Sequence, residues 1–318
     1  MSVAANGVAR RSSAHTAGDA LFAGIARSSG VFVLVLLGAI ILSLLAGGML
    51  AFRHFGPLHF LVSDDWDPVQ QQFGALVPIV GTIVTSVLAL LVAVPLAFGV
   101  AFYLTELAPV WLRRPVGTAI ELLAAIPSII YGMWGFFVLV PIMGQIIEPW
   151  LTDTVGNLPL IGWLFQGAPF GTGILTASLV LAIMVLPFIA ATMRDVFLTV
   201  PAVYRESAFG VGCTTWEVVR AIVIPYTRVS VVGGIMLGLG RALGETMAVT
   251  FVIGNADNIP TSLLAGGNTI ASLVALEFPE SQAGTLKLSA LLALGFILFV
   301  ISFIVLAISR LLLRPRQA

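Results

Sequence analysis

Between two long apolar runs, the chain reads Pro201-Ala202-Val203-Tyr204-Arg205-Glu206-Ser207-Ala208-Phe209-Gly210-Val211-Gly212-Cys213-Thr214-Thr215-Trp216-Glu217 and continues to Ile222-Val223-Ile224-Pro225. Pro201 suits the first turn of a short helix, and Gly212 suits the end of that helix, where a positive φ is needed. Thr214 and Glu217 match a capping box for a second short helix, which Pro225 should limit. The segment therefore predicts two short helices joined by a tight glycine corner.

Apolar side chains are interleaved with the polar ones of this segment, namely Ala208, Phe209, Val211 and Trp216. A helical knob of this makeup suits insertion into a groove of another protein. An incidental amphipathic loop without a partner is the alternative that these residues leave open.

The whole chain has the composition of a membrane protein. Of its 318 residues, 59% are hydrophobic and 9% are charged, whereas soluble domains carry about 25% charged residues. This excludes an ordinary soluble enzyme, and the balance of 15 basic against 15 acidic residues argues against nucleic-acid binding. The single cysteine, Cys213, excludes an intrachain disulfide, and no Cys/His cluster has metal-ligand spacing. We therefore predict neither a metal nor a cofactor.

Uncharged runs of about 20 residues recur, and each can cross a bilayer core of roughly 30 Å as a helix. They lie at about 31–52, 76–104, 117–140, 171–193, 229–253 and 288–309. We predict an all-α polytopic membrane protein whose six transmembrane helices form one domain, residues 31–318. Residues 1–30 are polar and rich in Ser, Ala and Arg, which indicates a flexible cytoplasmic tail rather than a signal peptide.

The basic residues predict the orientation. Twelve of the 15 lie on the side of the N-terminus, Arg53 and Lys287 lie on the opposite side, and Arg241 lies within a span. By the positive-inside rule the N-terminal side is cytoplasmic, and six spans place both termini there. The opposite loops are acidic, which would affect how a soluble partner docks.

Two irregular stretches accompany the spans. The outer loop 142–170 is apolar but punctuated by proline and glycine, and we expect it to fold against the outer membrane surface with Trp150 and Trp163 at the headgroup level. It is either a lid or a docking surface. Pro127 and Ser128 interrupt the third span, either as a kink in which Ser128 bonds back to a carbonyl or as part of a polar pathway.

Arg241 and Glu245 are four residues apart on the fifth span, hence on one helical face. Arg241 lies roughly 18 Å into a core of roughly 30 Å, where charge is expensive unless it faces protein or water. Glycines at four-residue spacing, Gly234 with Gly238 and Gly240 with Gly244, allow close helix contact. Either the two charges neutralise each other and fix helix packing, or Arg241 offers its guanidinium to an oxyanion in a pathway.

The spacing of Glu206-Ser207-Ala208, Gly212 and Ile222-Val223-Ile224-Pro225 resembles the EAA motif of ABC importer permeases, with Ser in place of the middle Ala. The resemblance implies that the segment 201–225 couples the membrane domain to an ATP-hydrolysing subunit, with its first short helix in a cleft of that subunit. The coupling residues would be Glu206, Ser207, Ala208, Gly212, Ile222 and Pro225.

Further stretches are similar to the PstC-type permease family of phosphate ABC importers: Gly210 to Glu217, Gly238 to Val249, Ala125 to Ser128, Phe251 to Asn255 and Glu277-Phe278. The likeness covers nearly all of the chain from about residue 30. It implies a type I importer permease (MetI-like) fold in the bacterial plasma membrane and a transport subunit rather than an enzyme. The family's transport-sensitive Arg and Glu match Arg241 and Glu245, and Pro127 and Ser128 would join them in the translocation pathway.

The implied partners are a paralogous second permease subunit, a dimer of ATP-hydrolysing subunits, an extracytoplasmic phosphate-binding protein, inorganic phosphate and membrane lipid. The chain itself has no GxxxxGK[ST] loop, so ATP hydrolysis requires such a partner. The residues alone leave open a permease for another oxyanion, sulfate or molybdate, and an ion-coupled secondary transporter. A membrane scaffold for phosphate signalling is a third class.

Overall fold

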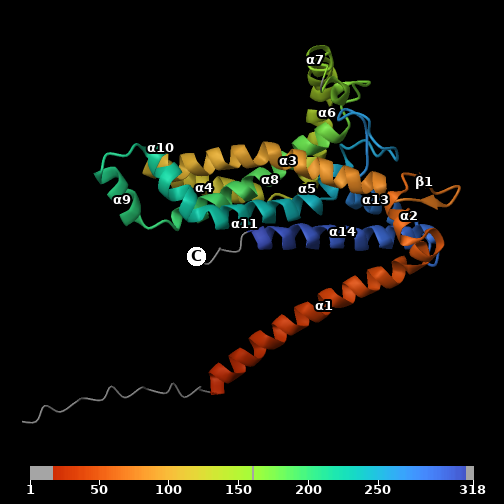
Figure 1. Ribbon diagram of the computed structural model, residues 1–318, viewed down its shortest axis with the longest axis horizontal. Coiled ribbons are helices and arrows are strands. Elements are labelled where there is room, and N and C mark those ends of the chain that lie inside the picture. Colours follow the sequence, from red (N-terminus) through yellow and green to blue (C-terminus); the bar gives the residue numbers. More distant parts are fainter. Residues whose placement is uncertain (1–16, 160, 313–318) are drawn as a thin grey trace, which may run out of the picture.

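The computed structural model describes residues 17–159 and 161–312, and nearly all of its regular structure is helical (Figure 1). Six helical stretches in this part are long and apolar enough to cross a membrane: Leu21–Phe55, Leu76–Leu107, Ser128–Thr154, Ile174–Leu198, Thr215–Leu243 and Leu286–Leu311. The predicted all-α fold with six spans is confirmed.

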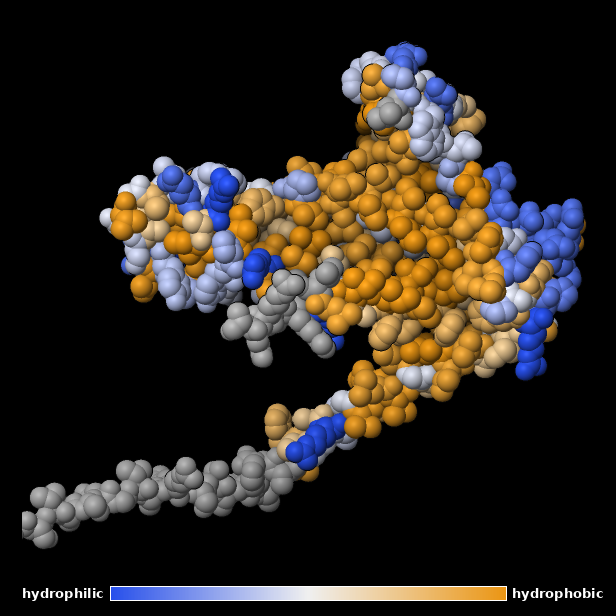
Figure 2. Space-filling view, viewed as in Figure 1, coloured by the Kyte–Doolittle hydropathy of each residue, from blue (hydrophilic) through white to orange (hydrophobic). Residues whose placement is uncertain are grey.

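The surface divides into an apolar middle and hydrophilic ends. Figure 2 shows hydrophobic residues over the middle of the bundle and hydrophilic residues gathered at its two ends. Large apolar side chains such as Leu91 and Phe303 are exposed along the spans. Because such surface is favourable in hydrocarbon and unfavourable in water, the apolar belt marks the part of the bundle that lies in the bilayer.

Helices α3 (Leu76–Phe102) and α8 (Ile174–Leu198) form the centre of the bundle. Small residues recur on α3 at four-residue spacing and are buried in one cluster with α8: Ala89, Ala93, Ala97 and Ala101. Such a stripe lets two helix backbones approach closely. Helix α8 is the most buried of the six spans, so it is the element on which the others are positioned.

Helix α11 (Ile224–Leu243) packs against α8 through glycines. Gly234 and Gly238 leave no room for a side chain between the two helices, which is the close contact expected from their spacing. The second pair with this spacing, Gly240 and Gly244, does not pack in the same way, because Gly244 stands at the end of the helix.

Helix α1 (Ala17–Phe55) extends away from the bundle (Figure 1). It begins well before the expected residue 31, so the interpretation as a flexible tail is wrong for residues 17–30. The reason is that Leu21, Phe22 and Ile25 continue the apolar helix ahead of the long run. Residues 1–16 of that tail lie outside the described part of the chain.

The second half of α1 packs on α14 (Leu286–Leu312). The Ser289 hydroxyl donates to the Gly47 carbonyl at 2.7 Å and accepts from the Ala51 N–H at 3.0 Å. In a regular helix these two backbone groups form a hydrogen bond with each other. The Ser289 hydroxyl is therefore inserted into the backbone hydrogen bonding of α1. The most apolar window of α1 has no buried residue among those described, which leaves an uncovered apolar surface.

The third span differs from its predicted limits of 117–140. Helix α4 (Val110–Ala124) ends before Pro127, and the membrane-length stretch begins after that proline. This stretch consists of α5 (Ser128–Trp134), η2 (Gly135–Leu139), α6 (Val140–Ile142), η3 (Met143–Ile147) and α7 (Glu148–Thr154). The apolar run was divided wrongly, because Pro127 ends one helix in the middle of that run.

The predicted outer loop 142–170 is therefore wrong in its first part. Residues 142–154 continue the helix and form an arm that rises from the bundle, with hydrophilic residues at its tip (Figures 1 and 2). The Glu148 carboxylate is fully buried in this arm and accepts a hydrogen bond from the Gly171 N–H at 2.9 Å. That bond ties the arm to the segment that leads into α8.

The fifth span covers residues 215–243 instead of 229–253. Helix α9 (Ala202–Gly210) precedes it, and α10 (Thr215–Val218) runs through the π-helical η5 (Val219–Val223) into α11. Within the rest of the predicted span, residues 245–253, the regular structure is the short α12 (Met247–Thr250). The apolar run continues across this break, which is why hydropathy alone extended the span.

The remaining elements lie at the two ends of the bundle. At the end nearer α9, α3 passes into the π-helical η1 (Tyr103–Leu107). The opposite end, called here the hairpin end, carries α2 (Pro57–Val62), the antiparallel strands β1 (Trp66–Asp67) and β2 (Gln72–Phe73), α13 (Ile270–Glu277) and η6 (Phe278–Glu280). The short η4 (Gly162–Phe165) packs on α7 in the arm.

Candidate coupling segment and translocation site

Helix α9 ends in the predicted glycine corner. Gly212 has φ 89°, the Gly212 N–H donates to the Phe209 carbonyl at 3.0 Å, and the Cys213 N–H donates to the Ala208 carbonyl at 3.1 Å. These two bonds and the left-handed residue form a Schellman motif, which pairs the carbonyls at the helix end. The direction of the chain between α9 and α10 is therefore fixed by one residue without a side chain.

The predicted capping box is also present. The Thr214 hydroxyl accepts from the Glu217 N–H at 3.4 Å, and the Glu217 carboxylate accepts from the Thr214 N–H at 2.7 Å. Pro225, however, does not limit the second helix, because η5 leads into α11 without a break. Pro225 lies in the first turn of α11, directly after the wide π turn, where its missing N–H costs little.

Exposure sorts the residues of the coupling segment into two groups. Glu206, Ser207 and Gly212 are exposed, whereas Ala208 is buried and Ile222 packs against the core. Pro225 is exposed on α11. Large apolar side chains also point to the surface of this small element: Val203, Tyr204, Phe209, Val211 and Trp216. The end of the bundle therefore presents an apolar knob with an acidic residue on it.

A second constellation forms where α5, α8 and α11 meet. The Arg241 guanidinium carbon lies 5.5 Å from the centre of the Phe188 ring on α8. Tyr131 of α5, whose hydroxyl donates to the Leu123 carbonyl at 2.9 Å, lies within range of the Arg241 charge. Gly132 of α5 lets this helix approach the backbone of α12 closely. Three segments distant in the sequence thus converge on Arg241.

Glu245 does not share a helical face with Arg241, contrary to the prediction. Helix α11 ends at Leu243, and the Glu245 carboxylate turns to the next helix, where it accepts from the Ala248 N–H at 3.1 Å. Among the described residues the ion pairs are Arg194–Glu121, Arg194–Asp195, Arg205–Glu106 and Lys287–Glu277. An Arg241–Glu245 pair is not one of them.

The break before α5 is a complete helix end rather than a kink. Pro127 stands at the N-terminal boundary of α5, and Ser128 is the first residue of that helix. Ser128 makes no hydrogen bond back to a carbonyl within residues 17–159 and 161–312. It lies one helical turn before Tyr131, on the same element that reaches Arg241.

A groove of about 430 Å³ adjoins this constellation. Phe188 lines it, together with Glu121 of α4 and Asp195 near the end of α8. The Glu121 carboxylate lies 2.6 Å from the Arg194 guanidinium, and this ion pair joins α4 to α8. The lining of the groove runs along α8 from Phe188, on which Arg241 is seated, to Thr199 at the end of that helix.

Sequence reasoning did not find Phe188, Tyr131 or Glu106 as site residues. An aromatic residue in an apolar span gives no signal of its own, because most such residues only pack. Gly244 did carry a signal, since a glycine at the end of a helix marks the break that separates Arg241 from Glu245.

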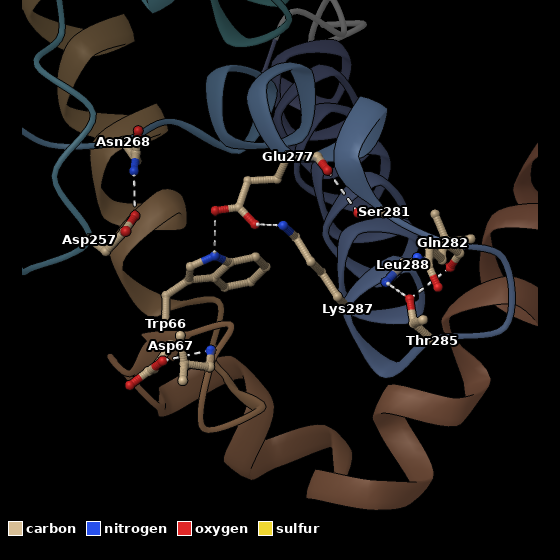
Figure 3. Close-up of polar contacts among 11 residues, drawn as sticks. Trp66, Asp67, Asp257, Asn268, Glu277, Ser281, Gln282, Thr285, Lys287 and Leu288 are labelled. Carbon is tan, nitrogen blue, oxygen red and sulfur yellow. Dashed lines mark hydrogen bonds and ion pairs between the residues drawn. The ribbon is translucent and has the colours of Figure 1, made fainter.

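Polar contacts at the hairpin end join β1, α13 and α14 (Figure 3). The Trp66 indole N–H donates to the Glu277 carboxylate at 3.2 Å, and the Lys287 ammonium lies 2.9 Å from the same carboxylate. The Asn268 amide donates to Asp257 at 2.6 Å. Burial raises the pKa of Asp257, the bond from Asn268 opposes this, and the nearby Glu277 carboxylate adds to the increase. Within the described residues, no three metal-ligating side chains gather.

Comparison with known proteins places the chain among membrane transport components. Residues 93–316 match the family model "Binding-protein-dependent transport system inner membrane component". The phosphate transport system permease protein PstC of Pasteurella multocida is 59% identical over 93% of this chain and 91% of its own length. The protein of the same name from Mesorhizobium japonicum is 55% identical over 93% and 90%.

A solved structure has the same fold. It is a bacterial ABC transporter involved in the import of the acidic polysaccharide alginate, with a TM-score of 0.58 and 17% identity. The alignment covers 94% of this chain and 99% of that one. The family match over residues 93–316 contains α8, the coupling segment and α11, so that similarity extends over both candidate sites.

Proposed function

The chain belongs to the family of binding-protein-dependent transport system inner membrane components, and we propose that it is the permease subunit of an ATP-driven importer of inorganic phosphate. It is a multi-pass inner membrane protein and a transport subunit rather than an enzyme, with ATP hydrolysis in separate subunits. The observation that carries the proposal is the exposed coupling segment with its Schellman corner, in a chain 59% identical to a phosphate permease.

The knob of α9 is the contact with the ATP-hydrolysing subunit in this proposal. Val203, Phe209 and Val211 offer apolar surface that a groove can bury, and Glu206 adds a charge that can orient the contact. A dimer of such subunits would dock one knob from this chain and one from a paralogous second permease subunit. The uncovered apolar surface of α1 suits packing against that second subunit or lipid.

The translocation pathway follows the face where Arg241, Phe188 and Tyr131 meet. With no carboxylate within 4.0 Å among the described residues, Arg241 keeps its guanidinium available to an oxyanion, whose geometry matches the planar fork. Pro127 and Ser128 stand at a helix break, which membrane proteins tolerate where backbone lines a cavity. Glu245 contributes to the site by accepting a hydrogen bond from the Ala248 N–H at the start of α12.

A permease for another oxyanion is the second candidate. A guanidinium fork binds sulfate and molybdate by the same geometry as phosphate, so Arg241 does not discriminate among them. An extracytoplasmic phosphate-binding protein would supply much of the selectivity, and it would dock at the acidic hairpin end. The names of the relatives favour phosphate.

The test is transport by the reconstituted complex. We would purify the chain with its co-purifying subunits, place the complex in liposomes and measure uptake of radiolabelled phosphate with ATP and the binding protein. Uptake that needs ATP and is not competed by excess sulfate or molybdate is the expected result. Uptake driven by an ion gradient without ATP would instead support a secondary transporter.

Orientation gives a separate prediction. In a Cys213→Ser background, Val69→Cys at the hairpin end should react with a membrane-impermeant thiol reagent in intact cells. Val211→Cys at the glycine corner should react only after permeabilisation, since the positive-inside rule places α9 in the cytoplasm. Both valines are more than four-fifths exposed in this chain (92% and 82%), and expressing it without the ATP-hydrolysing subunit keeps the proposed docking surface at Val211 accessible. The reverse labelling pattern would overturn the cytoplasmic assignment of both termini.

A further inference from the structure

Arg205 joins the coupling helix to the membrane bundle. Its Nη2 donates to the carbonyl of Phe197 at 2.6 Å and lies 3.2 Å from a carboxylate oxygen of Glu106. Phe197 belongs to the last turn of α8, and Glu106 belongs to η1 at the end of α3. One guanidinium therefore connects α9 with the ends of both central helices.

The two charged side chains are withdrawn from solvent. The Glu106 side chain is 6% exposed and the Arg205 side chain is 18% exposed. A buried charge is tolerated when an opposite charge lies next to it. Removing one partner of such a pair leaves the other charge buried and uncompensated. The Phe197 carbonyl is one of the last of its helix, where it accepts from the Val200 N–H at 3.3 Å, and Arg205 donates to it as a second, side-chain partner.

The other contacts of the coupling segment are aromatic and less directional. Trp216 meets Phe102 edge to face with ring centres 6.2 Å apart, and Tyr204 meets Tyr226 at 6.0 Å. Such rings can slide on each other at modest cost, whereas the hydrogen bond from the Arg205 guanidinium to the Phe197 carbonyl is directional. Among these contacts, only the one made by Arg205 reaches α3 and α8 together.

We propose that Arg205 and Glu106 are positioning residues that make α9 move as one body with the inner ends of α3 and α8. This inference rests on the proposed function, in which α9 receives the motion of the ATP-hydrolysing subunit. Helix α8 then carries the displacement from Phe197 along one continuous helix to Phe188, on which Arg241 is seated. The Arg205–Glu106 pair, called here the latch, thus connects ATP hydrolysis to the proposed anion site at Arg241 without touching the substrate.

The experiment compares transport with hydrolysis. Glu106→Gln and Arg205→Gln each remove one charge with little change in volume. In liposomes containing the whole complex, we would measure radiolabelled phosphate imported per ATP hydrolysed. We expect the complex to assemble and to hydrolyse ATP, but to import about tenfold less phosphate per ATP, because coupling free energies of this kind correspond to factors of this size. Arg205→Lys should restore part of the ratio, since it keeps the charge but not the fork.

Arg228→Gln is the matched control, because Arg228 is exposed on α11 just outside the coupling segment 201–225 and forms no ion pair within the described chain. It should keep the ratio of the unchanged protein. If the latch only stabilised the fold, the Glu106 and Arg205 variants would lose transport and hydrolysis in parallel with complex yield, and the ratio would not move. That result would overturn the inference while the unchanged complex still imported phosphate. Failure of the unchanged complex to import would instead overturn the proposed function.

Discussion

Replacing Gly212 with valine is expected to abolish phosphate uptake while the chain still inserts into the membrane. Gly212 has φ 89°, and a left-handed conformation costs an L-residue about 1–2 kcal/mol, more when the side chain is β-branched. The two Schellman bonds at the end of α9 depend on this conformation. The corner should therefore open, and the knob should no longer fit its groove. Membrane abundance, co-purification with the ATP-hydrolysing subunit and phosphate uptake are the measurements.

Gly210→Val provides the matched control, two residues earlier in the same segment. Gly210 is helical, and a side chain there would meet no atom within 4 Å, as is also true at Gly212. The two substitutions therefore add the same atoms to equally open positions and differ in backbone strain. We expect uptake close to normal for Gly210→Val. Equal losses from both substitutions would mean that the added bulk blocks docking, and normal uptake by Gly212→Val would remove the corner from the coupling mechanism.

Features that depend on neighbouring residues could be predicted from the sequence. The glycine corner and the box of Thr214 and Glu217 follow from hydrogen bonds within a few residues, so their patterns carry most of the required information. The number of spans can also be predicted from local sequence, because each apolar run that is long enough to cross one bilayer predicts one transmembrane helix.

Helix limits inside apolar runs could not be predicted in this way. Hydropathy does not distinguish a helix from a break when both are apolar, so the ends at Pro127 and Gly244 were passed over. Pro225 was misjudged for a related reason: whether a proline ends a helix depends on the turn before it, and η5 provides a π turn that no local pattern indicated.

Contacts between distant segments were the least accessible to sequence reasoning. Phe188 contacts Arg241, and so joins the proposed anion site, only because α8 passes beside α11. Glu106 pairs with Arg205 only because η1 ends beside α9. Arg241 was found because a charge in an apolar span is conspicuous. Its separation from Glu245 required the backbone path after Leu243, which turns the glutamate toward α12.

That separation leads to a prediction of large effect for Arg241. Arg241→Met should assemble into the complex but lose import by about 10- to 100-fold, since a charged hydrogen bond to the substrate contributes about 1.5–3 kcal/mol. Arg241→Lys should retain part of the activity, because a point charge lacks the planar fork. Glu245→Gln should be milder, because its amide oxygen can still accept from the Ala248 N–H. Phosphate uptake and complex yield are measured for each variant.

The double variant Arg241→Met with Glu245→Gln separates the pathway role from a structural pair. If the two charges neutralised each other, removing both would be less harmful than removing one, because no unpaired charge would remain. Since Glu245 instead caps α12, its replacement cannot compensate for the lost guanidinium. We expect the double variant to import no better than Arg241→Met alone. Recovery of uptake in an assembled double variant would show that the two residues act as an ion pair in the working complex, and Arg241 would then have a structural role only.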